Sequence, residues 1–168
     1  DVRAGASGCP ATVAGAVYCE VERDGAGAAT ATVHDARGQV VARVDPKGRT
    51  TSFGYSIDGD QTSIRQPSGK LTTQGYDVAH RLTSVDYPSG TPDVTFTYDA
   101  DGRRTSMDDG RHSSYSYDGA GRLLSTTNSA TGTVRFAYDR AGNLVDLTYP
   151  NGKAIHRTYD ADGRMVAL

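Results

Sequence analysis

The sequence predicts an all-β fold made of tandem β-hairpin repeats of about 21 residues, which form a continuous, twisted or spiralling antiparallel sheet. The first observation is a phrase, Tyr-Asp-x-x-Gly, whose first residue falls at positions 34, 55, 76, 98, 117, 138 and 159. The second is the composition, which has 20 Gly and 10 Tyr but few Glu or Lys. Because Glu and Lys favour helices while Gly, Asp, Thr and Tyr favour turns and strands, we expect almost no helix.

The phrase defines the structural motif of the repeat. It is complete in the copies at 98, 117, 138 and 159, keeps Tyr and Asp but has His80 in place of Gly in the copy at 76, and is worn at His34 and Tyr55. The motif residues that we expect to shape the fold are Tyr55, Tyr76, Asp77, Tyr98, Asp99, Gly102, Tyr117, Asp118, Gly121, Tyr138, Asp139, Gly142, Tyr159, Asp160 and Gly163.

Each unit carries two kinds of turn. One is the Gly four residues after the anchor, and the other is a Pro-x-Gly or x-Gly turn such as Pro67-Ser-Gly69 or Pro150-Asn-Gly152. Glycine supplies the positive φ that tight turns need. The runs between turns have the length of strands, and Val134, Phe136 and Tyr138 alternate with polar residues. Each unit is therefore predicted to be one hairpin with a single apolar face.

The motif side chains have predicted structural roles. The Tyr rings fill the apolar face while each phenol reaches a polar partner. The Asp accepts hydrogen bonds from the turn amides, and the Arg after the Gly lies within reach of that Asp or of a neighbouring unit's Asp.

Residues 1–33 are predicted to form a separate N-terminal region, before the repeat array of 34–168. This region is rich in small residues and includes a degenerate hairpin over 17–33, so it is a cap or a decayed repeat. Cys9 and Cys19 fall here; they close a short disulfide, or they remain as two reduced thiols. The start at Asp1 rather than Met leads us to expect a fragment of a longer protein.

Charge and hydropathy exclude several classes of protein. A net charge of -2 gives no basic footprint for nucleic acid, and no apolar run approaches the length of a membrane span. Two Cys without His neighbours do not make a metal site. We expect no cofactor and no metal.

The phrase Tyr-Asp-x-x-Gly-Arg-Leu, repeated with Asn-Gly or Ser-Gly turns between copies, resembles the YD-repeat (Rhs-repeat) family over roughly residues 34–168. That family includes bacterial Rhs and polymorphic toxins, insecticidal toxin-complex shells and teneurins. The resemblance implies a spiralling β-shell that encloses a toxin domain, or an extracellular adhesion module. The chain has too few repeats to close a shell, lacks the protease-like motif that ends such shells, and carries no effector after Leu168, so we expect it to supply a piece of wall.

Three patterns carry the chemical alternatives. Asp-Ala-Asp-Gly at Asp99–Gly102 and at Asp160–Gly163 resembles the start of a calcium loop, but no Glu follows Glu22 to complete one. The histidines lie in four different repeats, and the aspartates recur once per repeat, which favours structural roles over a catalytic dyad or a glycosidase pair. We predict no catalytic residues and no enzyme activity. The histidines are His34, His80, His112 and His156.

The leading functional prediction is a non-enzymatic structural module from a larger secreted, cell-surface or toxin-delivery protein. Its partners are then neighbouring repeats of the parent or an enclosed toxin domain. One alternative is a fibre or lattice subunit that assembles with other copies through open strand edges. Another is an adhesion module that binds surface glycans, with Tyr87 and Tyr149 as the sugar contacts because both precede Pro turns.

Overall fold

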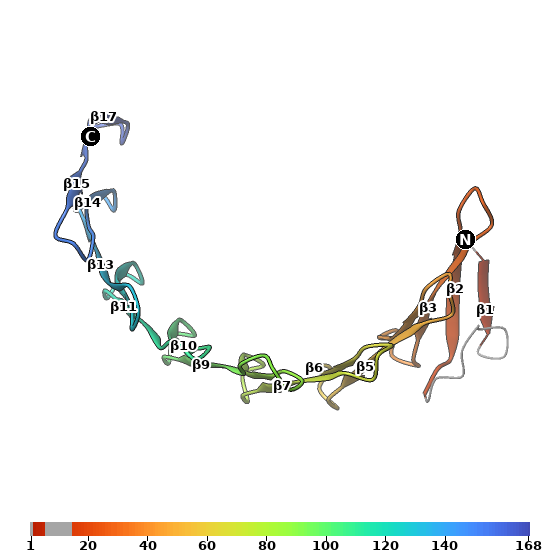
Figure 1. Ribbon diagram of the computed structural model, residues 1–168. Helices are drawn as coiled ribbons and strands as arrows, with labels where there is room; N and C mark the ends of the chain where they lie inside the picture. The colour runs from red at the N-terminus through yellow and green to blue at the C-terminus, as the bar shows by residue number, and fades with distance from the viewer. Residues whose placement is uncertain (1, 6–14) are drawn as a thin grey trace. The chain divides into compact units, whose positions relative to one another are not determined.

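The computed structural model describes residues 2–5 and 15–168, and these residues form strands and no helix (Figure 1). The predicted all-β chain of tandem hairpins in an antiparallel sheet is confirmed. Contacts divide the chain into two compact units, residues 1–91 and 92–168. The boundary expected between residues 33 and 34 stays a prediction.

In the first unit, every strand pairs antiparallel with the next strand along the chain. The expected hairpin over 17–33 is formed by β2 and β3, which close around the turn that begins at Asp24. The strands are β1 (Val2–Gly5), β2 (Tyr18–Arg23), β3 (Ala29–His34), β4 (Val40–Val44), β5 (Thr50–Tyr55), β6 (Gln61–Arg65), β7 (Leu71–Tyr76) and β8 (Leu82–Asp86).

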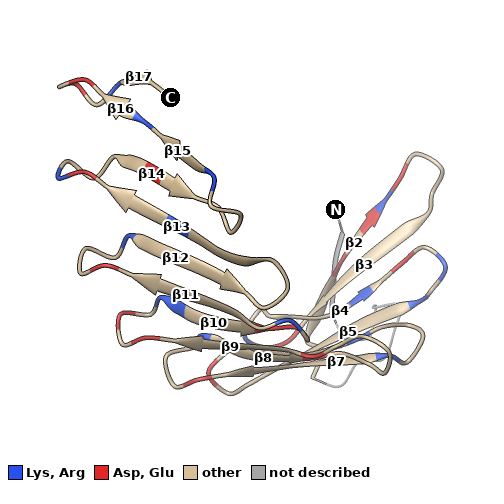
Figure 2. Ribbon diagram, turned by 60° about the vertical axis from the view of Figure 1, so that its left-hand side comes forward, with Lys and Arg blue, Asp and Glu red and all other residues tan. Residues whose placement is uncertain are grey.

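The second unit continues the same pattern, with a short final hairpin, β16–β17, that pairs by itself. The strands are β9 (Val94–Tyr98), β10 (Arg104–Asp108), β11 (Ser113–Tyr117), β12 (Leu123–Asn128), β13 (Gly132–Tyr138), β14 (Leu144–Thr148), β15 (Ala154–His156), β16 (Thr158–Tyr159) and β17 (Met165–Ala167). Acidic residues gather in the turns that follow β9, β11 and β13 (Figure 2).

A β-bulge follows the motif turn in every repeat. For example, Tyr138 pairs with Leu144 and Ala137 pairs with Asp146, so Val145 of β14 has no partner residue on β13. The same shift occurs at each of the other motif anchors whose pairing the structure gives. A bulge strengthens the local right-handed twist. The repeat therefore twists its sheet at one fixed position in each hairpin.

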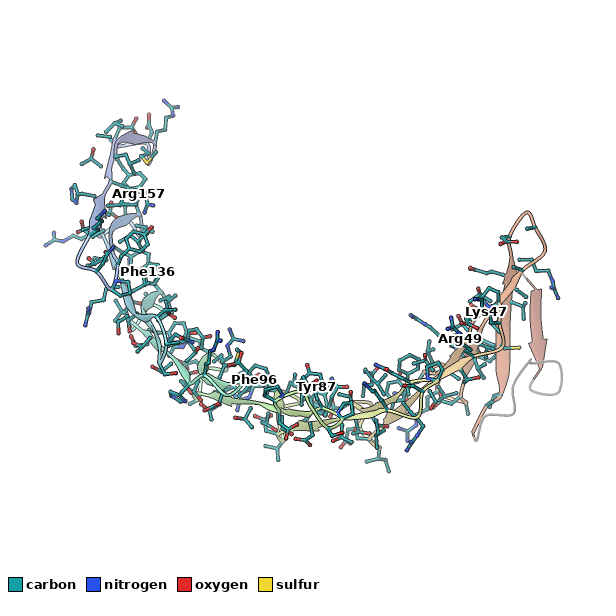
Figure 3. All side chains as sticks on the ribbon, viewed as in Figure 1. Lys47, Arg49, Tyr87, Phe96, Phe136 and Arg157 are labelled. Atoms are coloured by element: carbon teal, nitrogen blue, oxygen red, sulfur yellow. The ribbon has the colours of Figure 1, made fainter. Side chains whose placement is uncertain are left out.

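The two faces of the sheet differ in chemistry. We call the face that carries the motif rings the ring face; in the second unit it includes Phe96, Tyr115, Phe136 and Leu147, which alternate with the other face as the sequence predicts. The opposite, hydroxyl face carries cross-strand pairs of Ser and Thr, such as Ser116 and Ser125. Side chains stand on both sides of a single layer of strands (Figure 3).

Only one part of the described chain has a core of the usual kind. The cluster of Cys19, Val33 and Ala42 is fully buried, and Ala31 and Val44 beside it are nearly so. These residues belong to β2, β3 and β4. Along the later strands, most residues of the ring face are only partly buried.

Candidate functional site: the motif turn and its neighbours

The motif turn is closed by one aspartate. Oδ1 of Asp118 accepts the backbone N–H groups of Ala120 and Arg122, both at 2.9 Å, and Oδ2 accepts Nε–H of Arg122 at 2.7 Å. The N–H of Gly121 donates to the Asp118 carbonyl at 3.0 Å, and the φ of 81° at this position favours glycine. Sequence and geometry agree because a short carboxylate side chain can reach its own turn amides.

The same arrangement recurs along both units. In each case the Asp carboxylate accepts the amide four residues later, as at Asp35, Asp77, Asp99, Asp139 and Asp160. The backbone N–H of Arg81 and that of Arg122, together with their guanidinium groups, hold the pKa of Asp77 and that of Asp118 below the usual range. The carboxylates are therefore occupied by the turn itself.

The motif tyrosine joins one repeat to the one before it. The hydroxyl of Tyr138 donates to the carbonyl of Leu123 at 3.0 Å, and that of Tyr159 donates to the carbonyl of Leu144 at 2.9 Å. The acceptor is the residue just before the bulge, where the ladder is interrupted and a carbonyl needs a partner. The equivalent bonds of the other repeats are Tyr55 to Val40, Tyr76 to Gln61 and Tyr117 to Arg104.

The residue after the turn glycine, which we call the fifth-position residue, makes a second link in the forward direction. Arg122 lies 4.8 Å from the ring centre of Tyr138 in the next repeat and donates Nη1–H to the carbonyl of Asp139 at 3.2 Å. Arg103 does the same to Tyr117, at 5.2 Å. Neighbouring repeats are thus tied by a hydroxyl in one direction and a guanidinium in the other.

One repeat departs from this scheme. In the copy at Tyr55, Ser56 stands where the motif has Asp, and Asp60 stands in the fifth position. His80 fills the glycine position of the following turn with a φ of 60°, the one positive φ outside glycine among the described residues. A groove of about 630 Å³ runs between these two turns, lined by Ser56, Asp58, Asp60, Asp77 and His80 among others.

The calcium-loop resemblance at Asp99–Gly102 has a structural explanation. Asp99 accepts from the amides of Asp101 and Arg103, and Asp101 pairs with Arg103 Nη2 at 2.6 Å. The carboxylates face protein donors rather than one another. Within residues 2–5 and 15–168, no group of three or more His, Cys, Asp or Glu is arranged to hold a metal ion.

Each histidine lies beside a carboxylate, and no two of them share one. The pairs are His34 with Glu20, His80 with Asp60, His112 with Asp108, and His156 with Asp146, at 3.9, 2.9, 3.5 and 2.7 Å. His34, in a Tyr position, stacks on Tyr18 and leaves Nε2 buried without a hydrogen bond. Among the described residues, the hydrogen bonds of the His34, His80 and His156 rings go to Gly38, Asp60 and Asp146, none of which is a Ser or Cys nucleophile.

The remaining predicted residues lie apart from the motif turns. Tyr87 and Tyr149 are 40% and 39% exposed, so they remain accessible, and their role in sugar binding stays a prediction. Cys19 is buried and is not a free thiol, whereas Cys9 lies outside the described residues. The pairing of the two cysteines therefore also stays a prediction.

The geometry is that of a repeat protein whose hairpins are linked turn to turn, and family comparisons agree. Residues 92–168 match the Teneurin YD-shell model, and residues 58–92 match the RHS Repeat model. Together the two models cover residues 58–168, and the predicted resemblance to YD (Rhs) repeats is confirmed. No curated protein matches the chain.

Solved structures show the same fold in toxin complexes. The chain is similar to the crystal structure of TcdB2-TccC3 without its hypervariable C-terminal region, with a TM-score of 0.65 and 17% identity over 82% of this chain and 9% of that one. It is also similar to a Tc holotoxin pore structure from Photorhabdus luminescens, with a TM-score of 0.66 and 16% identity over the same shares. The chain thus spans about a tenth of the length of these neighbours. The described residues contain no helix that could span a membrane.

Proposed function

We propose that this chain is a non-enzymatic wall module: a piece of β-shell or stalk in a larger secreted, cell-surface or toxin-delivery protein. The observation that carries the proposal is the linkage of consecutive repeats through Tyr138 to Leu123 and through Arg122 to Asp139. The polar side chains of the motif form hydrogen bonds that join one hairpin to the next. Such groups hold a sheet together and leave little free chemistry for turnover.

The second support is the single-layer sheet. Its ring face carries large side chains, including Phe96 and Phe136, that are only partly buried (Figure 3). A sheet with an apolar face needs something against that face. In the proposed wall, that face meets an enclosed domain or a further part of the parent protein.

The test is cryo-electron microscopy of the full-length native protein that contains this segment. The proposal expects residues 58–168 to form one stretch of a larger curved wall, with one face turned toward an enclosed volume or toward a packed stalk. A map in which this segment stands as a separate domain with both faces in solvent would overturn the proposal.

Self-association through the strand β17 is the second candidate, because apolar residues on and beside this strand are exposed. Met165, Val166 and Leu168 are 55%, 62% and 78% exposed at this strand edge. Light scattering over a concentration series separates the candidates. A mass that grows with concentration, and stops growing when Val166 becomes Lys, supports assembly through this edge; a constant monomer mass removes it.

A further inference from the structure

The consecutive copies of the motif at Tyr55 and Tyr76 both depart from the motif, and their departures compensate one another. Four of the other repeats place Arg at the fifth position and two place Gln or Asn there, whereas the copy at Tyr55 has Asp60, and the Asp that would face it is replaced by Ser56. Two carboxylates in one turn would repel each other. The Ser56 hydroxyl instead accepts the amide of Asp60 at 3.1 Å, so the turn remains closed.

The link to the next turn is also reversed. At three other fifth positions, Gln39, Arg103 and Arg122 donate forward to a backbone carbonyl of the following turn. Asp60 cannot donate. Instead, Nδ1 of His80 lies 2.9 Å from Oδ2 of Asp60, and because a carboxylate only accepts, Nδ1 carries the proton and donates backward.

Histidine at position 80 has a backbone cost that glycine would avoid. Its φ of 60° lies in the left-handed region, which residues other than glycine seldom adopt, although Asn, Asp and His do so more often than the rest. The ring is 55% exposed, so it exchanges protons with solvent, while the Asp60 side chain is only 20% exposed. His80 therefore provides a link between repeats whose charge changes with pH. The links made by Gln39, Arg103 and Arg122 do not change, because an amide is always neutral and a guanidinium is always charged.

We propose that Asp60 and His80 form a proton-sensitive clasp between consecutive motif turns. Protonation of Nε2 converts a hydrogen bond between a neutral ring and a carboxylate into an ion pair, which tightens the clasp. The charged groups that face His80 are Asp60 and Asp58 from the preceding turn and Asp77 from its own turn. All three favour the protonated ring.

The direction of the pH effect follows from these neighbours. The hydrogen bond to Asp60, aided by the charges of Asp60, Asp58 and Asp77, raises the pKa of His80 above 6.5. A group whose pKa is higher in the folded state contributes its full stability below the unfolded value. The contribution is lost as the pH rises through the folded pKa, so the two turns are held together more firmly near pH 6 than near pH 8.5.

The experiment compares three forms of the chain. In the first variant, His80→Asn keeps a residue that tolerates positive φ but removes the titration. In the second, Ser56→Asp, Asp60→Arg and His80→Gly together restore the common motif, so the forward Arg link replaces the clasp. His34, His112 and His156 are present and unchanged in all three forms, so the differences between the forms isolate His80.

The readouts are the ring titration of His80 by NMR and the hydrogen-exchange protection of the turns at residues 56–60 and 77–81, from pH 6 to pH 8.5. Wild type is expected to titrate above 6.5 and to lose roughly two- to fivefold in protection toward pH 8.5. Both variants are expected to show no such loss, and the triple variant to remain protected throughout. A His80 pKa at or below 6.5, or a His80→Asn form that responds to pH as wild type does, would overturn the proposal.

Discussion

Two regions of the first unit share the same hairpin, but their apolar side chains lie on opposite faces of the sheet. In β2–β4 the hydroxyl-face positions hold Val33 and Ala42, which are completely buried, while the ring face carries His34 and Arg43. In β5–β8 the positions equivalent to Val33 and Ala42 hold Gly and Ser. Both regions keep the bulge, and an Asp turn is present in each, at Asp35 and at Asp77. The turns therefore specify the sheet, and the face residues decide only what each hairpin packs against.

In the Gly–Ser pairs, the Ser hydroxyl takes up the space beside the glycine on that face. A Cβ at Gly54 would clash with Oγ of Ser63, and one at Gly75 would lie 2.6 Å from Oγ of Ser84. Val33 and Ala42 pair at the equivalent positions without that restriction. The later repeats thus present a hydroxyl surface where the first one has a core.

The largest expected effect separates these two regions. Val33→Ala removes fully buried methyl groups and should lower the free energy of unfolding by about 2–3 kcal/mol. Ile64→Ala removes more atoms, but from a half-exposed position on the ring face, and should cost about 1 kcal/mol. Urea unfolding followed by circular dichroism measures both. Equal losses would mean that the two regions are buried alike.

A smaller effect tests whether the turn specifies the sheet. Gly121→Ala places a side chain at a φ of 81° and should cost about 1–2 kcal/mol, although there is room for the Cβ beside the guanidinium of Arg103. Gly119→Ala is the control in the same turn, because Gly119 has no positive φ and nothing lies within 4 Å of its Cβ. If the two substitutions cost the same, backbone conformation is not what the glycine supplies.

The hydroxyl link between repeats predicts an effect of similar or smaller size. Tyr138→Phe removes the bond to the Leu123 carbonyl and should cost about 1 kcal/mol, with the loss concentrated in β12 and β13. Tyr149→Phe is the matched control, since Tyr149 is 39% exposed and lies outside the motif. A Tyr138→Phe form as stable as wild type would show that the ring alone, rather than its hydroxyl, joins the repeats.

The smallest expected effect for any one residue appears in acid. Backbone and guanidinium hydrogen bonds lower the pKa of Asp45, Asp77 and Asp118. For a group with a lowered folded pKa, the stability is present above the unfolded value of 3.8 and is lost as the pH falls through the folded value. The melting temperature should therefore decrease below about pH 4, less steeply in Asp118→Asn. A melting temperature independent of pH down to pH 2 would contradict this.

Much of this structure could be predicted from the sequence, because each repeat carries the same turn residues and the same alternation of apolar and polar residues. The glycine at 121 and the aspartate at 118 specify their turn by local chemistry alone, and the alternation around Phe136 gives the ring face. Those features depend on residues that are close in the chain. They can be read without knowing what lies across the sheet.

The features that sequence reasoning missed depend on register. The bulge residue Val145 resembles any apolar strand residue, and the choice of Leu123 as the acceptor for Tyr138 follows from the shift that the bulge creates. Asp60 and His80 look like worn positions until the turns are placed side by side. One signal was available in the sequence: Ser56, Asp60 and His80 depart from the motif within the same pair of consecutive repeats.

Residue-resolved native-state hydrogen exchange tests the central claim most directly, namely that linked turns hold hairpins which open one after another. The account predicts the strongest protection of the first unit in β2–β4, and protection in the second unit that falls hairpin by hairpin toward β16–β17. Amides of the motif turns should remain protected together with their own hairpins. Uniform protection across each unit, lost in a single step, would contradict it.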